Sequence, residues 1–170
     1  WDELPTGRGR STPRELFGGD LRGVEQHLDH IESLGANLIY LTPFFPAGST
    51  HRYDATTFAH VDPLLGGDEA LQSLTAAVHA RGMRIVGDIT PNHTGDKHEW
   101  FQAALNGSEP ERGFYYFDES IPGGYESWLG HRSLPKLNWQ SAELHERFSV
   151  VLKRYVELGL DGWLVDVANM

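Results

Sequence analysis

The residues Arg84-Ile-Val-Gly-Asp-Ile-Thr-Pro-Asn-His93 form an apolar run that ends in polar side chains. A second run of this kind is Gly162-Trp-Leu-Val-Asp-Val-Ala168. Short apolar runs of this length predict buried strands, and each carries a carboxylate where its strand should end, Asp88 in the first and Asp166 in the second. Since ligand sites of parallel α/β folds lie at the carboxyl ends of strands, we expect both aspartates to face one site.

Helix and strand patterns alternate on either side of these runs. The continuous apolar sequence at 36–45 predicts another strand, covered on both faces. No period is clear from about 96 to 134, and because so long a structureless loop is unusual, we expect this insertion to fold into a small lobe. Apolar spacing, with Asp68 and Ser141 as candidate caps and Gly35, Gly82 and Gly159 as terminators, predicts helices over 21–34, 68–81 and 141–158.

This alternation predicts an α/β fold with right-handed βαβ units and a parallel sheet. Three strands cannot close a barrel, and a (β/α)8 barrel takes about 250 residues, so 170 residues would hold less than half of one. In this interpretation, residues 1–97 and 135–170 belong to the barrel, and residues 98–134 form the insertion. The chain begins with Trp1 and ends on Met170 directly after a strand, so we expect both ends to be cut.

Composition limits the classes of function. The net charge is −10 and the basic residues are scattered, so nucleic acid is not expected as a partner. No apolar stretch reaches the roughly 18 residues of a membrane span, and membrane association is not expected either. The chain has no cysteine, which excludes disulfides and thiolate chemistry within it but fits either redox compartment. Localisation and oligomeric state stay open.

Four short motifs follow one another at the expected strand ends and at the end of the insertion. They are His51-Arg-Tyr-Asp54, Asp88-x-x-x-Asn-His93, Leu134-Pro-Lys-Leu-Asn138 and Gly162-x-x-x-Asp166. Together they resemble the α-amylase superfamily of retaining glycoside hydrolases. The Pro-Lys-Leu-Asn form is most similar to the branch of neopullulanase, cyclomaltodextrinase and maltogenic amylase, where a Met usually stands in place of Leu134. The resemblance implies part of a (β/α)8 TIM barrel, from the first helix to the fourth strand, with a small B domain after the third strand.

The resemblance also implies roles for individual residues, with an α-glucan or maltooligosaccharide as substrate. Asp166 matches the nucleophile that forms a covalent glycosyl-enzyme intermediate, which a retaining mechanism pairs with an acid about 5 Å away. Tyr53 matches the aromatic residue that stacks under the sugar at the cleavage subsite. His93 and His51 match histidines that hydrogen-bond sugar hydroxyls, and Asp88 matches a buried supporting carboxylate.

Calcium is the one cofactor that the resemblance suggests, and no organic cofactor is expected. Asn92 matches a residue whose amide oxygen binds a structural calcium ion in many relatives, and Gly18 and Asp20 match a calcium-binding stretch of the neopullulanase-like branch. These supply only a few of the about 6 to 8 oxygen ligands that Ca²⁺ takes. Asn169, just past the nucleophile, is a candidate contact for an acceptor sugar, with no contact as an equal alternative.

Leu164 is the main departure from the family pattern, which places an arginine two residues before the nucleophile. Leucine supplies neither the charge nor the hydrogen bonds that would orient Asp166. In the family, the catalytic glutamate and a further aspartate come from later strands, beyond Met170. We therefore expect the 170 residues to be inactive as given. Three interpretations stay open: part of an α-glucan hydrolase, a non-catalytic amylase-fold protein that binds sugar or a partner, and an autonomous half-barrel fragment.

Two groups of side chains have plainer explanations. His27 and His30 lie off the apolar face of the first helix, so a solvated face is favoured over a metal site. The insertion is rich in aromatic residues, and for most of them we favour packing in the core of the lobe over service as sugar platforms. These aromatic residues are Trp100, Phe101, Phe114, Tyr115, Tyr116, Phe117, Tyr125 and Trp128.

Overall fold

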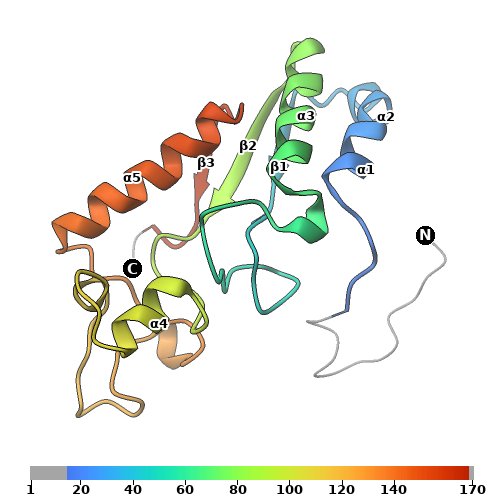
Figure 1. Ribbon diagram of the computed structural model, residues 1–170. Coiled ribbons are helices and arrows are strands. Elements are labelled where there is room, and N and C mark those ends of the chain that lie inside the picture. The colour runs from blue at the N-terminus through green and yellow to red at the C-terminus, as the bar shows by residue number, and fades with distance from the viewer. Residues whose placement is uncertain (1–14, 169–170) are drawn as a thin grey trace.

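The structure is a computed structural model that describes residues 15–168. Its centre is a parallel three-stranded sheet in the order β1-β2-β3. Figure 1 shows α3 and α5 flanking the strands, with α1 and α2 beside α3 and α4 beyond the carboxyl ends of the strands. The elements are α1 (Leu21–Gln26), α2 (Leu28–Ser33), β1 (Leu38–Leu41), α3 (Gly67–Ala80), β2 (Arg84–Ile89), α4 (Glu99–Leu105), α5 (Ala142–Glu157) and β3 (Gly162–Val165), with short 3-10 turns at Pro63–Leu65, Glu111–Phe114 and Trp128–Gly130. The predicted parallel sheet is confirmed.

The two faces of the sheet have different environments. On one face, Ile85 and Ile89 of β2 are fully buried against the helices. On the other face, Leu38 and Tyr40 of β1 are 48% and 40% exposed. The prediction that the strand within 36–45 is covered on both faces is therefore wrong for the part of the chain that the structure describes. The exposed face carries the candidate site, because side chains of one parity along parallel strands lie on one face.

The predicted first helix is broken in two at His27. The imidazole Nδ1 of His27 lies 2.8 Å from the carbonyl oxygen of Gly23. In a continuous α-helix this oxygen would accept the backbone N–H of His27, which instead donates to Val24 O at 3.0 Å. Side-chain competition for a backbone carbonyl explains the break, and apolar spacing alone could not predict it.

The strand predicted at 36–45 ends at Leu41, because only Leu38 to Leu41 pair with β2. Beyond Pro43, Phe44 and Phe45 turn into the helix-covered core, where each is only 1% exposed. Their rings lie 5.4 and 5.3 Å from the ring of Tyr155 on α5. The end of the apolar run therefore packs in the hydrophobic core instead of continuing the strand.

Helix ends follow the predicted caps with one exception. Ser141 caps α5 by accepting the N–H of Leu144 at 3.3 Å, and Gly159 follows this helix with a φ of +107°. Asp68 is not the cap of α3, because the helix already begins at Gly67. The carboxylate of Asp68 instead accepts the N–H of Val61 at 2.8 Å. Asp68 therefore ties α3 to the preceding loop.

The region between β2 and α5 contains α4, two 3-10 turns and isolated antiparallel bridges. The bridge from His93 to Lys136 and the hydrogen bond from Leu137 N–H to Asn92 O at 2.9 Å hold the end of this region to the segment that follows β2, and the bridge from Tyr115 to Leu137 holds its middle to the same end. Most of its aromatic residues pack into the hydrophobic core, as predicted. Those in the core or packed against it are Trp100, Phe101, Phe114, Tyr115, Phe117 and Tyr125. The division of the chain at residues 98 and 134 stays a prediction.

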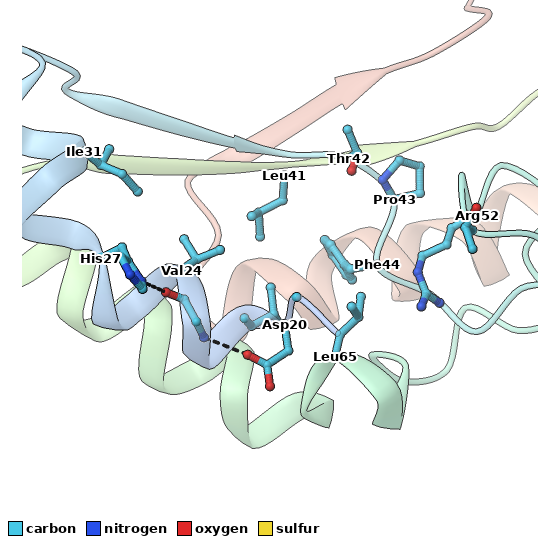
Figure 2. A pocket seen from close by; sticks show the side chains of 14 residues that line it. Asp20, Val24, His27, Ile31, Leu41, Thr42, Pro43, Phe44, Arg52 and Leu65 are labelled. Atoms are coloured by element: carbon cyan, nitrogen blue, oxygen red, sulfur yellow. Dashed lines mark hydrogen bonds between the residues drawn. The ribbon is translucent and has the colours of Figure 1, made fainter. Parts of the chain in front are cut away.

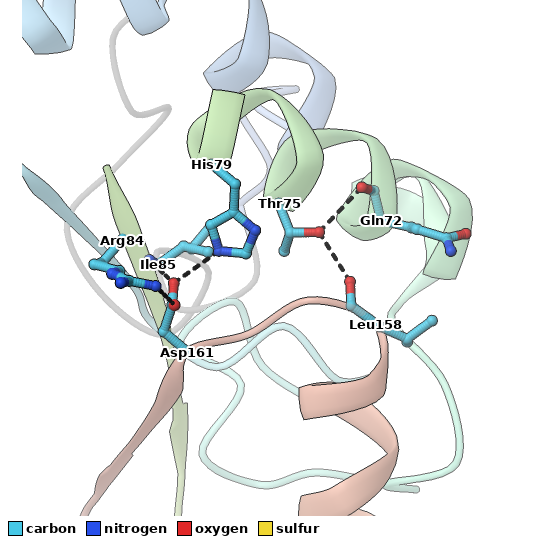
Figure 3. A network of polar contacts seen from close by, with 7 residues as sticks. All are labelled: Gln72, Thr75, His79, Arg84, Ile85, Leu158 and Asp161. Atoms are coloured by element: carbon cyan, nitrogen blue, oxygen red, sulfur yellow. Dashed lines mark hydrogen bonds and ion pairs between the residues drawn. The ribbon is translucent and has the colours of Figure 1, made fainter. Parts of the chain in front are cut away.

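A polar network fastens the amino-terminal ends of β2 and β3. Asp161 accepts the backbone N–H of Ile85 at 2.8 Å, an Arg84 guanidinium N–H at 2.7 Å, and lies 2.9 Å from His79 Nε2 (Figure 3). Desolvation opposes ionisation of Asp161, but these three partners outweigh it and lower the pKa of Asp161 to about 2. In the same view, Thr75 joins α3 to the end of α5 through Leu158 O at 2.8 Å.

Replacing Asp161 by Asn is expected to lower the free energy of unfolding at pH 7 by about 1 kcal/mol. The pKa of Asp161 is below its ordinary value of 3.8, so its contribution is complete above that pH and is lost as the pH falls toward 2. Urea unfolding at several pH values should show the two proteins converging as the pH falls through this range. Glu119→Gln, at an exposed acid in the insertion, is the control. A pH-independent difference would contradict the assignment.

Candidate active site at the ends of β2 and β3

Asp88 lies near the carboxyl end of β2 and is completely buried. Its Oδ2 accepts the hydroxyl of Tyr53 at 3.0 Å and also the hydroxyl of Tyr40 on β1. Its Oδ1 is buried and has no hydrogen-bond partner among residues 15–168. One fully buried oxygen therefore holds two tyrosines, while the other faces no donor.

The electrostatics of this cluster favour neutral groups. Burial raises the pKa of Asp88, and the negative charge of Asp166 adds to this, although the two tyrosine hydroxyls oppose it. The hydrogen bond to Asp88 and burial raise the pKa of the Tyr40 phenol above its ordinary range. Burial and Asp88 likewise raise the pKa of Tyr53. At neutral pH both tyrosines therefore remain hydrogen-bond donors to the carboxyl group.

Asp166 follows β3, and its backbone N–H donates to Ile89 O at 2.9 Å, which fixes it beside the end of β2. The side chain is half-buried. The next residue, Val167, has a φ of +52°, a conformation unfavourable for a β-branched residue, and such strain concentrates at functional sites. Leu164 pairs in register with Asp88, so its side chain, 44% exposed, lies on the same face as Asp88 and Asp166.

His93 is 3% exposed and follows the end of β2. Its Nδ1 lies 3.3 Å from Asn92 Oδ1. Burial lowers the pKa of His93, against the smaller opposing effects of the Tyr53 backbone and the charges of Asp166 and Asp54. The imidazole is therefore neutral at pH 7, which suits a hydrogen-bonding role.

The loop after β1 presents Tyr53. Exposed His51 accepts the Tyr53 backbone N–H at 3.1 Å on its Nδ1, and the two rings lie 5.9 Å apart. Arg52, which separates these two residues in the sequence, is 8% exposed and has a φ of +64°. Its guanidinium forms a buried ion pair with Asp62 and donates to Phe45 O at 3.0 Å. These contacts of Arg52 anchor the loop, so that Tyr53 reaches Asp88.

The residues suggested for calcium have other contacts or conformations in this structure. The carboxylate of Asp20 accepts the N–H of Gly23 at 2.7 Å as the cap of α1, beside a pocket between α1 and β1 (Figure 2). Gly18 has a φ of +77°, and the amide oxygen of Asn92 faces His93. No group of three or more His, Cys, Asp or Glu side chains suited to a metal occurs within residues 15–168. Calcium binding stays a prediction.

The structure brings together Asp88, Tyr53, His93 and Asp166, with His51 behind Tyr53. It places Asp20 apart from them at the α1 pocket, and Asn169 lies outside the described residues. His27 and His30 are exposed, as predicted. Sequence reasoning missed Tyr40 and Arg52. Tyr40 could have been found only with the strand register, since parity within β1 alone does not show which face meets Asp88.

Comparison with known proteins shows the family to which the chain is related. The family model of the α-amylase catalytic domain matches residues 4–170. A cyclomaltodextrinase from Bacillus sp. is 35% identical over 98% of this chain and 31% of its own length. Neopullulanase 2 from Thermoactinomyces vulgaris is 34% identical over 91% of this chain and 28% of its own. The structure of a cyclic α-maltosyl-(1→6)-maltose hydrolase from Arthrobacter globiformis matches with a TM-score of 0.85 and 37% identity, covering 92% of this chain and 37% of that one.

The parallel three-stranded sheet with helices packed on it defines an α/β protein. The chain belongs to the α-amylase catalytic-domain family. Its similarity to the cyclomaltodextrinase and neopullulanase branch, predicted from the insertion motif, is confirmed. The chain spans about a third of the length of the relatives it matches. No helix in the described part of the chain is long and apolar enough to cross a membrane.

Proposed function

We propose that this chain forms the nucleophile side of a retaining active site that acts on α-glucans or maltooligosaccharides. The observation that carries this proposal is the contact of the Tyr53 hydroxyl with buried Asp88 at 3.0 Å, beside Asp166 and His93. It fixes an aromatic ring, a carboxylate and a neutral imidazole around one position at the strand ends. A sugar ring needs this combination: an apolar surface to stack on, hydrogen bonds to its hydroxyls, and a nucleophile.

Each residue has a distinct role in this proposal. Tyr53 stacks under the sugar, and His93 hydrogen-bonds one of its hydroxyls. A carboxylate oxygen of Asp166 attacks the anomeric carbon, and the bond to the glycosidic oxygen breaks as an acid protonates that oxygen. Asp88 does not touch the sugar but holds Tyr53. The family resemblance assigns the acid to a glutamate on a later strand, and no glutamate follows Asp166 in these 170 residues.

Leu164 supports a second candidate function, a non-catalytic sugar-binding protein. Its side chain lies in register with Asp88 on the face that carries the site and supplies no donor to Asp88 Oδ1, which has no hydrogen-bond partner among residues 15–168. Tyr53 and His93 could still hold a sugar there. The two candidates therefore agree on binding and differ on turnover by Asp166.

Binding of maltoheptaose to the 170-residue chain, measured by calorimetry, tests the proposal. Tyr53→Ala removes the platform and should weaken binding at least tenfold, whereas Tyr116→Ala, in the insertion, should not. Absence of binding by the wild-type chain, or an equal loss in both variants, would overturn the proposed site.

The same preparation is expected to show no turnover of a nitrophenyl α-maltoside above the buffer rate. The reason is that Leu164 supplies no cation to Asp166 and that no glutamate follows Asp166 in these 170 residues to protonate the leaving group. Absorbance assays over hours at high protein concentration give the measurement. Turnover that disappears in Asp166→Asn would show that this expectation is wrong and would favour a complete active site.

A further inference from the structure

Trp128 differs from most other aromatic residues of the insertion. Six of them join the hydrophobic core or pack directly against it, but Trp128 is not part of that cluster within residues 15–168. Its ring instead faces His93, with centroids 5.6 Å apart and planes at 36°. Packing of the lobe therefore does not explain its position.

The local backbone holds the indole in this place. The Trp128 N–H donates to Leu134 O at 3.0 Å, and Trp128 O accepts the His131 N–H at 2.9 Å. Between them, Leu129 has a φ of +49° and its side chain is 66% exposed. A non-glycine residue in the left-handed region is unfavourable, and here it gives no burial in return, which is common where a functional side chain is being positioned.

The indole N–H itself is unsatisfied. Nε1 of Trp128 is buried and has no hydrogen-bond acceptor in the described part of the chain. Buried tryptophans usually have an acceptor for this group. The ring also meets exposed His131, with centroids 5.7 Å apart and planes at 30°. Trp128 thus contacts both buried His93 and exposed His131.

We propose that Trp128 is a second aromatic platform for the glucan, contributed by the insertion and adjoining the sugar held by Tyr53 and His93. The inference rests on the proposed function and extends it to a neighbouring sugar unit. The occupant is a glucosyl ring, whose apolar face packs on the indole. Two platforms on different elements favour oligosaccharides over single sugars, because only an oligosaccharide contacts both.

Labelling with 5-fluorotryptophan provides the test, because the chain has five tryptophans whose ¹⁹F signals can be assigned by substitution. Titration with maltoheptaose should shift the Trp128 signal, and glucose at the same concentration should shift it much less. The signal of Trp163, which stacks on Phe44 on the helix-covered face, should not move and serves as the reference.

Affinity measured by calorimetry completes the test. Trp128→Ala should weaken maltoheptaose binding about tenfold, and Trp128→Phe should weaken it less, since a smaller ring remains. Trp163→Phe should leave the affinity unchanged. The inference is wrong, and the proposed function stands, if the wild-type chain binds maltoheptaose without a shift of the Trp128 signal and both Trp128 variants bind with wild-type affinity. If the wild-type chain does not bind, both are overturned.

Discussion

Replacing Leu164 by Arg is expected to raise kcat by on the order of a hundredfold in a protein that carries this chain together with the rest of the barrel. Register places position 164 beside Asp88, and its parity places it on the face of Asp166. A guanidinium there would orient the carboxylate of Asp166 through charge-assisted hydrogen bonds. KM should change much less, since Tyr53 and His93 do not depend on this residue to hold the sugar.

Two further variants separate charge from geometry. Leu164→Lys supplies a charge without the planar fork and should raise kcat less than arginine, and Leu164→Met, similar in volume, should leave it unchanged. The kinetics are measured on a maltooligosaccharide. Equal kcat for the leucine and arginine forms would mean that position 164 does not act on the nucleophile and that the role assigned to Asp166 is wrong.

A second readout of Leu164→Arg needs no activity. Asp88 Oδ1 is buried without a donor, and burial together with the Asp166 charge raises the pKa of Asp88. A guanidinium in register would offset both effects and lower that pKa. Carbon-detected NMR titration of the Asp88 carboxyl in the two forms of this chain should show the shift, and Leu164→Met should not.

The fold was predictable where local sequence sets the structure. β2 occupies the apolar run 84–89, and Ser141 begins α5, because strand burial and helix capping depend on nearby residues. The broken helix was not predictable, because it depends on the His27 imidazole taking a backbone carbonyl. The role of Asp68 was missed for a similar reason, since its partner Val61 belongs to a loop whose path the sequence does not reveal.

The site shows the same division. Motifs identified Asp88 and Tyr53 as site residues, but not that a single oxygen of Asp88 binds two hydroxyls. Tyr40 required the register of β1, and Trp128 required the path of the insertion, which no periodicity encodes. Side chains contributed by a neighbouring strand or by an irregular loop are those that sequence patterns leave undetermined.

The backbone of Gly95 packs directly against the loop that presents Tyr53. Its N–H donates to Ala55 O at 3.0 Å. A Cβ at this position would overlap the carbonyl oxygen of Asp54, and it would lie 2.8 Å from the Asp54 carbonyl carbon and 2.9 Å from Ala55 O. These are backbone atoms, so no side-chain rotation can relieve the contact, and the loop must move.

Gly95→Ala is therefore expected to lower the free energy of unfolding by about 2–3 kcal/mol and the melting temperature by about 4–12 °C. It should also weaken maltoheptaose binding, because movement of the loop withdraws Tyr53 from Asp88. Gly113→Ala is the matched control, since an added Cβ there meets nothing within 4 Å. Both substitutions reduce the entropy of the unfolded chain alike, so their difference isolates the close contact. Calorimetry of the two variants that gave equal melting temperatures and equal sugar affinity would show that the Gly95 contact does not position the Tyr53 loop.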